Sequence, residues 1–315
     1  MPELMPNADS IIFKDNFVER YKELTNFEEF KKYSLSFLRR SIRVNTLKIK
    51  IEPLKKKLEA RNWILTQIPW CKEGFWVEHK EGRRDIGNLP EHQLGYFYVQ
   101  EAASMIPPLA LVPEPGEFIL DMAASPGSKA SQIAAMMENK GVLVANDYKA
   151  MRMKPLSANL QRMGISNVIL TMMEGRYFRD FQFDRILLDA PCSGTGTIRK
   201  SLKTLLIWNP IMVRRLASTQ KQLIETAFNN LKKGGILVYS TCSNEPEENE
   251  GVITFLLEKY PDAKLEEINI PELKRSPAIL EFEDQKYNPE VRKCIRIWPQ
   301  DNDTEGFFVA KIIKD

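Results

Sequence analysis

Two of the four cysteines occur in short motifs that can place a reactive thiol at the end of a strand. Cys192 follows an apolar run in the motif Asp-Ala-Pro-Cys-Ser-Gly, and Cys242 follows another in Ser-Thr-Cys-Ser. Ligands of an open α/β sheet bind beyond the carboxyl ends of its strands, so two neighbouring strands would deliver both thiols there. A thiolate is a strong nucleophile, which favours covalent chemistry at this edge. Cys71 and Cys294 lack such motifs and are expected to be buried packing residues.

The cysteines do not follow a metal-binding or disulfide pattern. The sequence has no CxxC pair and only two histidines, so no metal site is expected. Wide cysteine spacing in a chain of 315 residues predicts free thiols rather than a disulfide framework. No apolar stretch approaches the roughly 20 residues that a membrane helix needs. The first ten residues do not resemble a signal peptide, so a cytoplasmic protein without membrane contact is expected.

A loop of small residues follows the apolar run at residues 118–122. It reads Ala123, Ala124, Ser125, Pro126, Gly127, Ser128 and Lys129. Small residues let a ligand approach the backbone, and the helix that follows supplies unpaired amide donors. Lys129 would lie at the positive end of that helix, which is unfavourable unless an anion offsets it. A ligand carboxylate or phosphate would do so, whereas a lysine that points to water is the alternative. The loop does not match GxGxxG, which argues against a nicotinamide cofactor.

Acidic residues end the next two apolar runs. Asp147 comes 26 residues after Asp121, where a carboxylate can bind ribose hydroxyls, although capping of the next helix is an equal alternative. Arg152 lies one or two helical turns further on and could pair with Asp147 or reach the ligand. Glu174 follows the third run and could accept a hydrogen bond from an adenine amino group, or simply serve a turn. These residues are the predicted cofactor contacts beside the small-residue loop.

The elements that position these residues follow an alternating pattern from residue 117 onwards. Short apolar runs alternate with longer helical patterns, which is typical of βαβ units and a largely parallel sheet. The runs cover residues 118–122, 142–146, 168–170, 186–189 and 236–240. Helices are predicted at residues 128–138, 149–163, 210–232 and 247–259. Two last strands, at residues 294–298 and 307–313, are close enough for an antiparallel hairpin. This order predicts an α/β, Rossmann-like methyltransferase sheet.

The first 115 residues have a mixed pattern that predicts a smaller α+β domain. Helices are expected at residues 15–37 and 54–61, and strands at residues 42–47 and 74–77. Prolines at 107, 108, 113 and 115 then interrupt the chain. We therefore divide the chain into residues 1–115 and a catalytic domain at residues 116–315.

The smaller domain carries most of the positive charge. Residues 31–61 contain eleven Lys and Arg and two Glu, a net charge of +9, so the rest of the chain carries −6. A block of this kind suits a phosphate backbone, and a solvated amphipathic helix is the alternative. Arg39, Arg40 and Arg43 are the candidate phosphate contacts.

These motifs together resemble the RNA 5-methylcytosine methyltransferases, the family that includes Fmu and NSUN proteins. The matching segments are residues 43–48, 98–104, 121–129, 147 with 152, 189–194, 240–242 and 304–309. Two departures stand out. The family loop commonly reads Cys-Ala-Ala-Pro-Gly-Gly-Lys, whereas Ala123, Ser125 and Ser128 replace three of its residues here, and Glu174 stands where Asp is usual.

The resemblance implies a class I methyltransferase that uses S-adenosyl-L-methionine. Cys242 would attack carbon 6 of cytosine as a thiolate, which makes carbon 5 nucleophilic enough to accept a methyl group. Asp189 would bind the cytosine ring and border the cofactor. Cys192 would assist product release, and Lys129 would contact the active site or the methionine carboxylate. The target cytosine must be flipped out or lie in a flexible region.

The resemblance also implies an RNA partner. A tRNA is the expected substrate and rRNA is the alternative, with a helper protein of the archease type expected by analogy with archaeal members. Asn45 joins the three arginines as a candidate RNA contact. A DNA cytosine methyltransferase would use Cys192 as its nucleophile and would not require Cys242. A catalytically silent RNA-binding factor with the same fold is the non-enzymatic alternative, and the sequence does not indicate an oligomeric state.

Overall fold

The main sheet is built from strands whose successive residues face opposite sides. The computed structural model describes residues 2–315. The strands of this sheet are β5 (Phe118–Asp121), β6 (Val142–Asn146), β7 (Val168–Thr171), β8 (Phe183–Asp189), β9 (Leu231–Thr241), β10 (Ala263–Glu266), β13 (Ile295–Ile297) and β14 (Phe307–Lys314). Their order is β10-β14-β9-β8-β5-β6-β7, with β13 also paired to β14. The five strands from β9 to β7 run parallel, and β14 is antiparallel to β9, β10 and β13. The predicted methyltransferase sheet and its antiparallel hairpin are confirmed.

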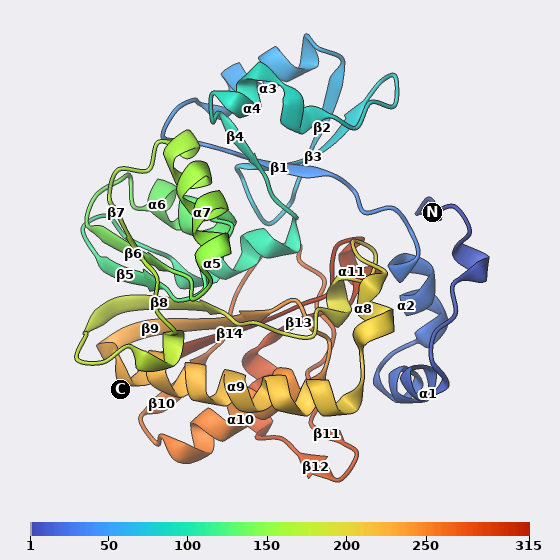
Figure 1. Ribbon diagram of the computed structural model, residues 1–315, viewed down its shortest axis with the longest axis vertical. Helices are drawn as coiled ribbons and strands as arrows, with labels where there is room; N and C mark the ends of the chain where they lie inside the picture. The colour runs from blue at the N-terminus through green and yellow to red at the C-terminus, as the bar shows by residue number, and fades with distance from the viewer. Residues whose placement is uncertain (1) are drawn as a thin grey trace.

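Two helical layers cover the two faces of this sheet (Figure 1). Ile119 and Leu187 pack into one core, whereas their chain neighbours Leu120 and Leu188 pack into the other. This alternation follows from the two-residue period of a strand. The first core is shared with α5 (Ile106–Leu111), α6 (Ser128–Met136) and α7 (Ala150–Met163). The second core is shared with α9 (Pro210–Asn229) and α10 (Glu250–Lys259).

A smaller antiparallel sheet lies above the main one in Figure 1. Its strand order is β2-β3-β1-β4. The elements of this unit are β1 (Ser41–Val44), α3 (Ile51–Glu59), β2 (Trp63–Gln67), β3 (Gly74–His79), α4 (Pro90–Gln93) and β4 (Phe97–Val99). Leu54 and Leu58 from α3 share its core with Ile42, Trp63 and Phe97. The α+β character expected of this region is present, but β2 and β4 were not predicted.

The first two helices pack against the catalytic region rather than against the smaller sheet (Figure 1). These helices are α1 (Asp15–Leu24) and α2 (Phe27–Ser34), which replace the single helix predicted at residues 15–37. The helix is interrupted at Asn26. Its side chain accepts a hydrogen bond from the Glu29 amide and so caps α2. Phe17 packs edge-on against Trp208, with 4.8 Å between the ring centroids. The division at residue 115 stays a prediction.

The remaining elements are short and connect the larger ones. The helical pieces are α8 (Lys203–Ile207), α11 (Pro299–Asn302), η1 (Ala8–Ser10), η2 (Ile86–Asn88), η3 (Ala103–Met105), η4 (Gly175–Tyr177), η5 (Thr195–Thr197), η6 (Pro246–Glu248) and η7 (Pro289–Lys293). The strands β11 (Glu281–Phe282) and β12 (Gln285–Lys286) form a separate hairpin. Across residues 2–315, no helix has the length and apolar character needed to cross a membrane.

Candidate active site

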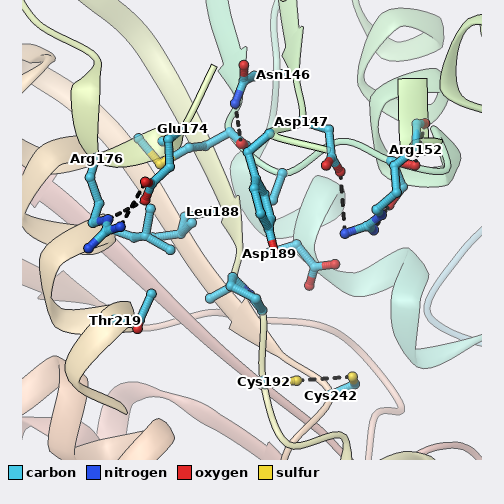
Figure 2. A pocket seen from close by; sticks show the side chains of 18 residues that line it. Asn146, Asp147, Arg152, Glu174, Arg176, Leu188, Asp189, Cys192, Thr219 and Cys242 are labelled. Atoms are coloured by element: carbon cyan, nitrogen blue, oxygen red, sulfur yellow. Dashed lines mark hydrogen bonds and ion pairs between the residues drawn. The ribbon is translucent and has the colours of Figure 1, made fainter. Parts of the chain in front are cut away.

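A cavity of 410 Å³ opens at the carboxyl ends of the parallel strands (Figure 2). This is the edge at which open α/β sheets bind their ligands. Its lining comes from the segments that follow β5, β6, β7, β8 and β9, and from one face of α9. The lining residues are Met122, Ala123, Ser125, Asn146, Asp147, Tyr148, Arg152, Glu174, Gly175, Arg176, Leu188, Asp189, Ala190, Pro191, Cys192, Thr219, Leu223 and Cys242. Both predicted thiols therefore face one cavity with the predicted acids.

The two thiols are in contact. The sulfur atoms of Cys192 and Cys242 are 3.2 Å apart, and both cysteines are free thiols. Asp189 and Ser240 are register partners at the ends of β8 and β9, so each thiol lies two or three residues beyond a paired position. The hydrogen bond with Cys242, together with burial, raises the pKa of Cys192 well above its ordinary value. The S–H group of either cysteine can donate to the sulfur of the other.

Lys129 and Asp189 form a buried ion pair beside the thiols. The Lys129 Nζ atom lies 2.7 Å from Asp189 Oδ2, and the Ser240 hydroxyl donates to Asp189 Oδ1 at 2.8 Å. Burial alone would lower the pKa of Lys129, but the charge and the hydrogen bond of Asp189, with smaller contributions from Cys242 and Asp121, together outweigh it and the pKa is raised. Asp189 is thus the anion that offsets the lysine at the start of α6.

Asp147 and Arg152 hold one end of the cavity. The Asp147 carboxylate is buried; its Oδ1 accepts from the Lys149 amide at 3.1 Å, and its Oδ2 lies 3.4 Å from the Arg152 guanidinium. The pairing with Arg152 is therefore present, whereas the bond to the Lys149 amide lies in the turn before α7 and does not cap the helix. Arg152 also donates to the Ser125 carbonyl at 2.6 Å, which ties the small-residue loop to α7. Asp147 Oδ2 has no hydrogen-bond donor within residues 2–315 and is available to a ligand hydroxyl.

Glu174 and Arg176 hold the other end of the cavity, as Figure 2 shows. Their side chains form an ion pair, which lowers the pKa of Glu174. Arg176 also donates to the Gln222 side chain at 2.8 Å. Both side chains are partly exposed, so a ligand can displace the arginine from the carboxylate.

Only part of the small-residue loop borders the cavity. Ala123 and Ser125 line it, whereas Ala124, Pro126, Gly127 and Ser128 do not. Gly127 has a φ of +101° at the turn into α6, a conformation that favours glycine. Ala123 and Ser125 are therefore the residues of this loop that face the cavity.

Arg43 and Asn45 lie inside the protein rather than on an RNA-facing surface. Arg43 is 2% exposed, and its guanidinium donates to the side chains of Gln100 and Ser131 at 2.8 Å each. The Asn45 side-chain amide donates to the carbonyls of Gly95 and Met163. Both residues connect the smaller sheet to the catalytic region. Their placement corrects the expectation of RNA contact, because neither can reach a phosphate without breaking these bonds.

Arg39 and Arg40 lie nearer to solvent. The guanidinium carbon of Arg39 is 3.8 Å from the centre of the Trp76 ring, and Arg40 is exposed. Cys71 and Cys294 are buried as expected, and burial raises the pKa of the Cys71 thiol to about 12.

Three residues of the site were not singled out from the sequence. The Asn146 side-chain amide donates to the carbonyls of Met122 and Met173, so it fixes the segments after β5 and β7. Thr219 reaches the cavity from α9, and nothing in its sequence context marks it. Asp121 ends β5 next to the loop; burial and the Asp189 charge raise its pKa to about 7. Its position directly before the loop was the available signal.

The donors and acceptors of the cavity fit S-adenosyl-L-methionine. The free oxygen of Asp147 suits a ribose hydroxyl, and the Glu174 carboxylate suits an exocyclic amine. The apolar side chains of Leu188 and Leu223 border the space between these two ends. A cavity that is apolar in its middle and polar at its ends is what a nucleoside requires.

The sheet, the cavity and the paired motifs define a class I, S-adenosylmethionine-dependent methyltransferase. The chain belongs to the 16S rRNA methyltransferase RsmB/F family, whose model matches residues 108–313. A second model, the N-terminal domain of 16S rRNA methyltransferase RsmF, matches residues 13–102. Family membership makes the protein an RNA cytosine-5 methyltransferase and agrees with the resemblance seen in the sequence.

Relatives with two kinds of RNA substrate in their names are similar to the chain. The tRNA (cytosine(49)-C(5))-methyltransferase of Pyrococcus abyssi is 50% identical over 94% of this chain and 95% of its own length. The ribosomal RNA small subunit methyltransferase F of Shewanella piezotolerans is 45% identical over 96% of this chain. The chain spans 64% of that second relative.

Solved structures show the same fold over almost the whole chain. A methyltransferase homologue from Pyrococcus horikoshii is 37% identical, with a TM-score of 0.87 over 99% of this chain and 100% of its own. The NSun6 protein of the same organism, crystallised with the S-adenosylmethionine analogue SFG, is 26% identical. Its TM-score is 0.84 over 96% of this chain and 98% of its own.

Proposed function

We propose that the protein methylates carbon 5 of a cytosine in tRNA through a covalent adduct with Cys242. The contact between the Cys192 and Cys242 sulfur atoms, at 3.2 Å beside Asp189, carries this proposal. By resemblance to the family, Cys242 is the nucleophile, and Cys192 is the thiol beside it that assists product release.

The first step joins Cys242 to the target base. The thiolate forms a bond to carbon 6, and the electron pair of the C5–C6 double bond moves towards carbon 5 and the ring. Asp189 lies beside the thiols with one oxygen on Lys129 and the other on Ser240. Its carboxylate is assigned to accept from the exocyclic amine of the base, while ring nitrogen 3 takes up a proton from solvent during the attack and returns it on product release. When bound, S-adenosylmethionine supplies the methyl group that carbon 5 accepts.

The second step releases the product. The proton on carbon 5 leaves to solvent, its electron pair restores the C5–C6 double bond, and the bond between carbon 6 and Cys242 breaks. Cys192 donates its proton towards the departing Cys242 sulfur. That donation makes Cys242 a better leaving group, because a lower sulfur basicity speeds departure. Cys192 thus acts in release and not in attack.

The choice of tRNA rests on similarity. The tRNA-modifying relative from Pyrococcus abyssi is matched along 95% of its length at 50% identity. An rRNA substrate is the second candidate, because the family model and the Shewanella relative carry rRNA in their names.

The test is methyl transfer to separate nucleic acids. The protein is incubated with methyl-tritiated S-adenosylmethionine and, in separate reactions, with tRNA, rRNA and duplex DNA. Digestion and chromatography then identify the labelled nucleoside. We expect labelled 5-methylcytosine from tRNA, and none from tRNA with the Cys242→Ala variant. Label from rRNA alone would show that rRNA is the substrate and would support the same reaction. No label in any pool would contradict the proposal.

A further inference from the structure

Another cavity, also of 410 Å³, is lined by residues 37–41, 84, 99–101 and 199–200 and shares no lining residue with the first. Segments from both parts of the chain form its walls. Its lining includes five cationic side chains, those of Arg39, Arg40, Arg84, Arg199 and Lys200. Its acidic lining residue is Glu101, whose carboxylate oxygens accept from the amides of Ser104 and Glu305. The lining is therefore strongly positive.

Most of these cations have no carboxylate partner. Arg199 does have one: its guanidinium donates to Asp303 at 2.9 Å and to the Phe37 carbonyl at 2.6 Å, so it stabilises the fold. Within residues 2–315, Arg39, Arg40 and Arg84 make no ion pair at 4.0 Å or less. Lys200 lies 3.7 Å from a Glu305 oxygen and remains exposed.

Aromatic rings hold two of the guanidinium groups in place instead. The Arg39 guanidinium lies over Trp76, and that of Arg84 lies 4.1 Å from the centre of the Phe37 ring. Arg40 donates to the Arg84 carbonyl, so these two residues are in contact, and burial with the nearby Arg84 charge lowers the pKa of Arg40. Crowded cations repel one another, and a bound anion removes that cost.

The loop that carries Lys200 also contacts the backbone of Cys242. The Gly196 amide donates to the Cys242 carbonyl at 3.0 Å, and the Gly306 amide donates to the Gly196 carbonyl at 2.8 Å. Lys200 follows Gly196 by four residues, and Glu305, its nearest carboxylate, precedes Gly306. Lys200 therefore lies on the same loop as the glycine that contacts the Cys242 backbone, which links the cationic cavity to the thiol pair.

We propose that this cavity binds a phosphodiester of the RNA strand next to the target cytosine, with Arg40, Arg84 and Lys200 as its contacts. The inference rests on the proposed function, since it assumes that the cytosine belongs to an RNA chain. It assigns to Arg84 and Lys200 a role that sequence patterns did not give them. Phosphate contacts of this kind fix the register of the strand and leave the reading of the base to the active site.

The experiment measures RNA affinity over a series of salt concentrations. Full-length protein is titrated with an unmodified tRNA transcript in a filter-binding assay, and calorimetry with S-adenosylmethionine checks that each variant retains its cofactor site. The double variant Arg84→Ala/Lys200→Ala removes two cavity charges. The matched control, Lys56→Ala/Lys57→Ala, removes two exposed charges from α3, which lies in the basic segment at residues 31–61 and outside this cavity.

We expect the cavity variant to lower RNA affinity about tenfold or more and to reduce the salt slope by about 1 to 2, as the loss of two phosphate contacts requires. The control should change both quantities less. Arg84→Lys should keep most of the affinity and Arg84→Glu should lose it. Equal effects of the cavity and control variants, or Arg84→Lys as weak as Arg84→Glu, would overturn the phosphate site.

The two proposals fail in different ways. If the wild-type protein binds RNA through these cations but transfers no methyl group, the phosphate site holds and the proposed function falls. If it methylates tRNA and the cavity variant does so with unchanged affinity, the function holds and the phosphate site falls.

Discussion

The two halves of the active site hold their charged groups in different ways. In the half formed by β6 and β7, Asp147 and Glu174 pair with the partly exposed Arg152 and Arg176. In the half formed by β8 and β9, Lys129 and Asp189 pair with each other, and Asp189 is further bound by Ser240. The first arrangement can exchange its arginine partners for a ligand, whereas the second is fixed by strand ends that are register partners.

This difference separates binding from chemistry. A cofactor must enter and leave at each turnover, so the groups that hold it benefit from partners that solvent can replace. A nucleophile and the groups that activate it must keep their positions to within a fraction of an ångström, and neighbouring strands provide that rigidity. Substitutions in the two halves should therefore change different kinetic parameters.

The largest effect is expected from the thiols. Cys242→Ala removes the nucleophile and should lower kcat by at least about 10³-fold, because no other group can form the bond to carbon 6. Cys192→Ala leaves attack intact but removes the proton donor for release, so a covalent protein–RNA complex should accumulate. Denaturing gel electrophoresis after incubation with RNA and cofactor measures both outcomes.

The matched control for both thiols is Cys71→Ala, a buried cysteine far from the cavity lining. It should form no stable complex and retain methyl transfer. A stable complex with Cys242→Ala but none with Cys192→Ala would exchange the two roles and favour the mechanism of a DNA cytosine methyltransferase.

A smaller effect is expected from the acids that bind the cofactor. Asp147→Ala should weaken S-adenosylmethionine binding by about 10- to 100-fold, the usual cost of losing a hydrogen bond to a charged group. Glu174→Ala should cost less, because its carboxylate is more exposed and already neutralised by Arg176. Calorimetry gives the two affinities, and kcat at saturating cofactor should stay near the wild-type value. A large fall in kcat for Asp147→Ala would contradict the separation of the two halves.

The smallest effect concerns Asp121, which lies between the halves. Its pKa of about 7 in the folded protein exceeds the ordinary value of 3.8, so the folded chain retains a proton that the unfolded chain releases. The stability that this proton contributes is present below pH 3.8 and is lost as the pH rises towards 7. Asp121→Asn should therefore gain stability over the wild type as the pH rises from 4 to 8, which urea denaturation at several pH values measures. An unchanged difference across this range would contradict the assignment.

The main sheet was predictable because its strands carry strong local signals. Each parallel strand contains an apolar run that ends in a polar residue, and all five were found. The ends of the helices and strands were predicted less accurately. The helix expected to end at residue 232 ends at Asn229, because β9 begins at Leu231 and is longer than its apolar core. The strand β2 was missed since only Trp63 of its five residues is fully buried, which leaves little alternation to detect.

Site residues that belong to a sequence motif were predictable. Residues whose orientation depends on tertiary contacts were not. Cys192, Cys242, Asp189 and Lys129 come together as their strand-end positions implied. Arg43 resembles its neighbours Arg39 and Arg40 in sequence, yet it points inward to Gln100. Arg43 lies in β1 whereas Arg39 and Arg40 precede it, and no local pattern marks Arg43 as the residue that meets α6.

The aromatic contact between α1 and the catalytic region has a consequence for how the chain matures on the ribosome. Phe17 is among the first residues synthesised, but its partner Trp208 follows some 190 residues later. At about 5 to 20 residues per second, that interval lasts roughly 10 to 40 seconds. During this time the apolar face of α1 can pack against α2 but not against the surface that carries Trp208, so the earliest helices of the chain are among the last to reach their final place.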